Sequence, residues 1–194
     1  MGTLSFCAML PLALAASLVT AAAATGPLDS WHADQVSTQR VGMYVLGTWA
    51  LGNILVGGVG TATATDERTR SFHLGNLAWN GVNLVLAGAG LWSALRAPAT
   101  APDARALLID SEFQEKLFFV NAALDVAYLA TSAFLWQRGE ARGDVRLVGF
   151  GQALLLQGAF LLAFDTVMGI LHVRLTHRLL EQVQISPLGV LARF

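Results

Sequence analysis

The sequence has few charged residues for its length. Of 194 residues, 13% are Asp, Glu, Lys or Arg, whereas soluble domains carry roughly 25%. Four apolar stretches hold just two of these charges, Asp125 and Asp165. The stretches are 41–62, 73–95, 117–137 and 147–171. This segregation excludes an ordinary soluble globule, a disordered chain and a coiled coil.

Other residue types and motifs that are rare or absent exclude several classes of function. There is one cysteine, Cys7, so no intramolecular disulfide and no site with several thiolates can form. The net charge is −1, so no basic surface attracts nucleic acid. No phosphate-binding glycine loop, nucleophile elbow or HExxH motif occurs. The apolar stretches predict membrane-spanning helices, as argued below, which would place His73 and His172 at opposite membrane faces. These two histidines therefore cannot bind one cofactor together. We therefore expect no nucleic-acid partner, cofactor, metal site or enzymatic activity.

The four apolar stretches predict an all-α membrane protein. Each reaches the length of about 20 residues that crosses bilayer hydrocarbon. The backbone must satisfy its own hydrogen bonds there, which favours helices. Because the connections are short and polar, neighbouring helices should be antiparallel. The prediction is a polytopic four-helix transmembrane up-down bundle with a polar interior, over residues 25–171.

The two ends of the chain lie outside the four apolar stretches. Residues 1–24 form an apolar run with small residues at Ala22 and Ala24, followed by Pro27, which favours a cleaved signal peptide. No basic residue precedes the run and it is long enough to span a bilayer, so an uncleaved fifth helix is the alternative. Residues 172–194 are predicted to form an amphipathic tail, either at the interface or continuing the fourth helix to Pro187.

Composition indicates the source and the location. Eleven arginines against one lysine, with abundant alanine and glycine, are typical of a GC-rich bacterial genome. We therefore expect a multi-pass protein of the bacterial inner membrane. Both readings of the first 24 residues place residue 30 outside the cytoplasm, but the distribution of basic residues leans the other way, which leaves the orientation open.

Polar residues recur at helical spacing inside the four stretches. Facing lipid, they would be costly; facing inward, they can bond neighbouring helices. Each helix therefore has one face expected to point to the interior of the bundle. The polar-core candidates are Arg40, Tyr44, Asn53, Asn76, Asn80, Asn83, Asn121, Asp125, Tyr128, Gln157 and Asp165.

Depth within the bundle predicts a charged cluster. At 1.5 Å per residue, Asp125 and Asp165 differ in depth by about 3 Å, and the long side chain of Arg40 can reach them. We expect an Arg40–Asp125–Asp165 cluster joined by Tyr44 and Asn121. It is either an ionic lock between helices or, because two close carboxylates cannot both stay ionised in low dielectric, a proton or cation pathway.

Amides are expected in the other half of the bundle. The sequence places Asn53, Asn76, Asn80, Asn83 and Gln152 there. They either form hydrogen bonds between helices or line a cavity for a small polar or amphipathic ligand. Gln157 and Tyr128 should lie between the two halves.

These motifs resemble a family of functionally uncharacterised bacterial four-helix integral membrane proteins. The resemblance covers roughly residues 36–171 and implies the bundle without implying an activity. It is carried by Arg40, the run 49–53, His73, Asn76, Trp79, Asn80, Asn83, Asn121, Asp125, Tyr128, Gln157, Gly158 and Asp165.

Two functions are compatible with this pattern. The first is a non-catalytic bundle in the lipid bilayer whose polar core binds a small ligand or that scaffolds a complex with other membrane subunits. The alternative is a proton- or cation-linked permease or sensor that uses Asp125 and Asp165.

Overall fold

Four long helices dominate the structure. The computed structural model describes residues 26–186 and 189–192. The helices are α1 (Pro27–Thr63), α2 (Glu67–Leu95), α3 (Ala104–Arg142) and α4 (Val145–Gln182). Each predicted apolar stretch lies within one of them, which confirms an all-helical architecture for this part of the chain.

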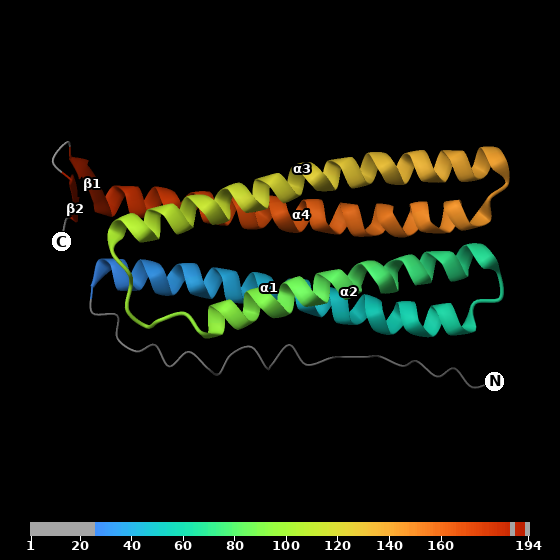
Figure 1. The fold of residues 1–194 in the computed structure, drawn as a ribbon, viewed down its shortest axis with the longest axis horizontal. Helices are drawn as coiled ribbons and strands as arrows, with labels where there is room; N and C mark the ends of the chain where they lie inside the picture. The colour runs from blue at the N-terminus through green and yellow to red at the C-terminus, as the bar shows by residue number, and fades with distance from the viewer. Residues whose placement is uncertain (1–25, 187–188, 193–194) are drawn as a thin grey trace, which may run out of the picture.

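The helices form two hairpins that lie side by side along the long axis of the molecule (Figure 1). One hairpin is α1 with α2 and the other is α3 with α4, and consecutive helices run in opposite directions. The hairpins join mainly through α4, which packs against both α3 and α2. We call the end with the turns 64–66 and 143–144 the hairpin end, and the opposite end the head.

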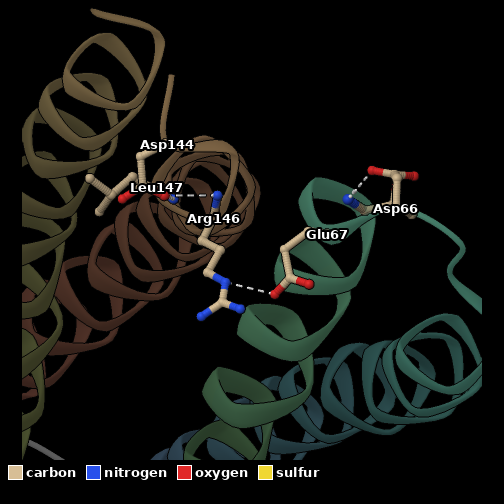
Figure 2. A network of polar contacts seen from close by, with 6 residues as sticks. Asp66, Glu67, Asp144, Arg146 and Leu147 are labelled. Atoms are coloured by element: carbon tan, nitrogen blue, oxygen red, sulfur yellow. Dashed lines mark hydrogen bonds and ion pairs between the residues drawn. The ribbon is translucent and has the colours of Figure 1, made fainter. Parts of the chain in front are cut away.

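Local sequence signals define the hairpin end. Asp66 caps α2 by accepting a hydrogen bond from the amide of Thr69 (2.9 Å), and Gly143 ends α3 with a φ of 67°, a value that glycine adopts without strain. The guanidinium of Arg146 then donates to Glu67 across 2.7 Å. Figure 2 shows this ion pair connecting the two hairpins.

The Asp66 cap predicts a dependence on acidity. The amide of Thr69 holds the pKa of this carboxyl below its ordinary value of 3.8. Because the folded pKa is the lower one, the cap stabilises the fold fully above pH 3.8 and loses its effect as the pH falls through the folded pKa. We expect Asp66→Ala to lower the thermal midpoint at pH 7 and much less at pH 2, measured by circular dichroism.

A matched substitution separates capping from charge. Asp66→Asn keeps a side-chain oxygen that caps almost as well but removes the titrating group. It should retain the midpoint at pH 7 and show a weaker acid dependence than the wild type. An Asp66→Ala variant with an unchanged midpoint at pH 7 would contradict the role of this cap.

Helices α1, α3 and α4 are the longest and extend well beyond the thickness of a bilayer. With 37, 39 and 38 residues, α1, α3 and α4 are about 55 Å long or more, against about 30 Å of hydrocarbon. Their excess packs at the head around a buried cluster of Trp31, Leu107, Leu175 and Leu179. The indole of Trp31 donates to the carbonyl of Leu175 (2.7 Å). The head is therefore a small hydrophobic core of its own.

Hydropathy separates α2 from the other helices. Among the described residues, α1, α3 and α4 are long and apolar enough to cross a membrane. Asn76, Asn80 and Asn83 reduce the mean hydropathy of α2, and all three are buried within the molecule. Hydropathy alone thus supports three of the four predicted spans.

The C-terminal tail differs in part from the prediction. Helix α4 continues through residue 172, but it ends at Gln182 rather than at Pro187. The strands β1 (Val183–Ser186) and β2 (Gly189–Ala192) follow and pair antiparallel. Val183 and Ile185 are β-branched and the next segment contains Pro187, a residue that cannot continue a helix. The predicted signal peptide, residues 1–24, lies outside the described residues.

Candidate functional site

Small residues allow the polar side chains to meet. Gly151 of α4 lies against the backbone of Ser132 and Trp136 in α3, and the hydroxyl of Ser132 donates to the carbonyl of Gly151 (2.8 Å). Gly57 of α1 lies equally close to the backbone of Leu77 in α2. Backbones this close bring short amides from separate helices within hydrogen-bonding range.

Gln157 is the centre of a buried set of amides. Its side chain is fully buried and donates to Asn76 of α2 (2.6 Å) and Asn53 of α1 (3.4 Å). Its oxygen accepts from the indole of Trp49 (3.0 Å). We call Trp49, Asn53, Asn76 and Gln157 the amide cluster. It connects α1, α2 and α4 by side chains that satisfy one another.

The amides of α2 extend this cluster along the helix. Asn80 donates to the backbone carbonyl of Asn76 (2.8 Å), and Asn83 donates to the side-chain oxygen of Asn80 (3.4 Å). Both side chains are buried. Gln152, expected among these amides, instead accepts from the exposed side chain of Arg68 (3.2 Å) at the hairpin end. Its position near the start of α4 places it outside the core.

The two carboxyl groups of the spans lie together. Asp125 of α3 is 2% exposed and Asp165 of α4 is 5% exposed. Their side chains interact directly, and Asn121 also contacts Asp165. The Oδ2 atom of Asp125 has no hydrogen-bond partner within the described part of the chain. We call Asp125 and Asp165 the acid pair.

Arg40 and Tyr44 do not join the acid pair. Met43 and Gly47 of α1 contact α2, at Gly90 and Ala87, and Arg40 lies one turn before Met43 on that side of the helix. Arg40 has no ion pair among residues 26–186, and its Nε is buried without a partner.

Tyr44 is 52% exposed on the outer surface of the molecule. The predicted cluster of Arg40, Tyr44 and the two aspartates is therefore wrong in its first-helix members. The rotation of α1 that packs Gly47, Gly57 and Gly60 against α2 turns both side chains away from the acid pair.

Tyr128 contributes an aromatic contact between hairpins. Its ring meets the ring of Trp79 edge to face, with centroids 4.9 Å apart. Trp49 stacks on Phe160 with centroids 3.9 Å apart. Trp49 and Trp79 therefore both pack within the bundle.

His172 is buried, although the sequence predicts it at a membrane face. Its side chain is fully buried and stacks on Phe118 with centroids 5.2 Å apart. Neither ring nitrogen has a hydrogen-bond partner among the described residues. The available signal was its spacing: His172 follows Asp165 by seven residues, which puts both on one face of α4.

The two hollows described for residues 26–186 lie at the surface rather than among the buried amides. Within residues 26–186, the groove of about 500 Å³ lies on the outside, between α1 and α4, and its lining is mostly apolar. A second hollow lies on the surface of α3, around Trp136 and Glu140. No group of three or more His, Cys, Asp or Glu side chains in the described part of the chain could hold a metal ion.

Comparison with known proteins assigns part of the chain to a family. Residues 45–166, more than half of the chain, match a family described as "Family of unknown function (DUF6992)". Neither a curated protein nor a solved structure matches. The match confirms the predicted resemblance to an uncharacterised family, while the bacterial and membrane attributes of that resemblance stay predictions.

Proposed function

We propose that this chain, which belongs to the DUF6992 family of unknown function, is a membrane-embedded proton sensor that uses its acid pair. It is a multi-pass protein of the bacterial inner membrane, with four spans in up-down order. Residues 1–24 are a signal peptide that is cleaved.

The observation that carries this proposal is the direct contact of Asp125 with Asp165. Two carboxylates repel each other strongly in a medium of low dielectric constant, and no described cation forms an ion pair with either one. The contact is favourable when the two groups share one proton. The ionic lock that competes with this interpretation needs Arg40, which lies on the α2 side of α1.

A sensor fits the surroundings better than a permease. The amide cluster lies in the core, and the hydrogen bonds of Gln157 all go to other members of the cluster. A protonation change at the acid pair would act on the contact between α3 and α4. That contact continues into the head through the hydrogen bond between Ser111 and Thr176 (2.7 Å), so the head could report the change.

Infrared spectroscopy of the full chain in lipid vesicles tests this proposal. We expect a carbonyl band of a protonated carboxylic acid near neutral pH, where exposed carboxyl groups are ionised. The band should vanish in Asp125→Asn with Asp165→Asn and persist in the control Glu181→Gln, which changes an exposed carboxyl group of α4. The double variant should still fold, because two amides can replace the shared hydrogen bond.

The alternative function is a non-catalytic scaffold for other membrane subunits. The satisfied amide cluster favours it, since such bonds hold helices together without needing a ligand. Under this alternative, the acid pair shares its proton in the same way but only holds α3 and α4 together, so the double variant loses thermal stability. The thermal stability of the double variant thus separates the two functions.

A further inference from the structure

The groove between α1 and α4 is open to the outside of the molecule. It has a volume of about 500 Å³ and is lined by residues 37–45 of α1 and residues 160–171 of α4. Its walls are apolar, except for the hydroxyl groups of Ser37 and Thr38 at the end near the head. Most of this lining belongs to the apolar stretches 41–62 and 147–171. In a bilayer, the groove therefore faces hydrocarbon, and an acyl chain is the chemical group that fills it.

The head end of the groove carries positive charge. Arg178 of α4 forms an ion pair with Asp34 of α1 (3.0 Å), which bridges the two helices just beyond Ser37. Arg174 lies three residues after Leu171, a lining residue, and four before Arg178, so all three share one face of α4. Arg174 is exposed and has no ion pair among the described side chains.

One uncompensated arginine thus lies above an apolar groove. Arginine side chains at the end of a span reach the level of the lipid headgroups. The planar guanidinium group suits the bidentate binding of a phosphate. Because Asp34 already neutralises Arg178, the remaining positive charge is that of Arg174. This single charge matches a lipid headgroup that carries one phosphate and no cation.

We propose that the groove binds one phospholipid of net negative charge from the surrounding bilayer. An acyl chain lies between α1 and α4, and the phosphate contacts Arg174 with the hydroxyl groups of Ser37 and Thr38 beside it. This inference rests on the membrane embedding in the proposed function, but it is independent of the acid pair.

Native mass spectrometry of the full chain in detergent tests the site. The added lipids are phosphatidylglycerol and phosphatidylcholine with identical acyl chains. We expect the wild type to retain one phosphatidylglycerol in preference to phosphatidylcholine. Arg174→Gln should reduce this preference about tenfold, the effect of one charge-assisted contact. The control Arg105→Gln removes another exposed charge near the head and should leave the preference unchanged.

Filling the groove tests the acyl-chain site. Ala163 lines the groove, and Ala163→Trp should weaken the binding of both lipids. Ala159, one turn earlier in α4, is also exposed but does not line the groove, so Ala159→Trp is the matched control. Equal lipid binding by the two tryptophan variants would overturn the proposal, as would an unchanged lipid preference in Arg174→Gln.

Photocross-linking of the wild type keeps the proposal testable if a variant does not fold. Phosphatidylglycerol with a photoreactive acyl chain, in vesicles of phosphatidylcholine, should label residues 41–45 and 160–171. Labelling confined to other surfaces of the spans would reject the groove while supporting membrane embedding. Absence of labelling anywhere in the spans would reject membrane embedding itself. The infrared band of the acid pair is measured separately, so its failure does not affect this outcome.

Discussion

Replacing Gly149 by alanine is expected to destabilise the protein by about 3 kcal/mol, at the upper end of the usual cost of overpacking. A β-carbon at this position would overlap the carbonyl oxygen of Arg68 in α2 and would lie 3.0 Å from the amide nitrogen of Phe72. Backbone atoms cannot rotate away as a side chain can. The methyl group would therefore push α4 away from α2 at the hairpin end, where the two hairpins meet.

Gly81→Ala provides the matched control for this substitution. Gly81 is a helical residue of α2, and a β-carbon there would have no atom within 4 Å. Since alanine is the better helix former by about 1 kcal/mol, Gly81→Ala should leave the stability unchanged or raise it. Thermal unfolding in detergent, followed by circular dichroism, compares the two variants. A Gly149→Ala variant as stable as the wild type would mean that α2 and α4 do not pack as closely as described.

Replacing Gln157 by leucine is expected to cost about 2 kcal/mol. The substitution keeps the volume nearly constant but leaves the indole of Trp49 and the side-chain oxygen of Asn76 without their partner. A buried group that loses its hydrogen bond costs about 1–3 kcal/mol, whereas hydrogen bonds between membrane helices are worth about 0.6 kcal/mol on average. The expected value lies between these limits because Gln157 contacts two neighbouring helices.

Two measurements test the prediction for Gln157→Leu. The unfolding midpoint should fall, and the fluorescence of Trp49 should change because its indole loses an acceptor. Gln137→Leu is the control, since Gln137 is exposed on α3 and forms no described hydrogen bond. If both leucine variants unfold at the wild-type midpoint, the amide cluster does not stabilise the bundle, and its polar residues would need another explanation.

The buried faces of the helices could be predicted well from the sequence. Asn76, Asn80 and Asn83 are spaced so that they lie on one side of a helix, and all three are buried in α2. Similar depths from the ends of their spans suggested that Asp125 and Asp165 meet, and the structure places them together. These predictions succeed because they use only the periodicity of a helix and the cost of exposing polar groups to hydrocarbon.

The surroundings of Arg40 and His172 could not be predicted from the sequence. Spacing gives the angle of a residue around its own helix, but it does not say which neighbouring helix lies at that angle. Arg40 was assigned to the acid pair, although its side of α1 packs against α2. His172 was placed at a membrane face because α4 was expected to change character after residue 171, whereas packing in the head keeps this histidine buried.

The sequence by itself determined that the chain forms four helices, that most of their polar-core candidates are turned inward and that the two acids lie close together. These properties follow from local geometry and from the incompatibility of charge with hydrocarbon. Only the tertiary structure decided that Gln157 unites three helices, that Arg40 stands apart from the acid pair and that α1 and α4 leave a groove between them. The physical reason is that these contacts depend on which backbones approach most closely, and that is set by glycines and bulky side chains on several helices at once.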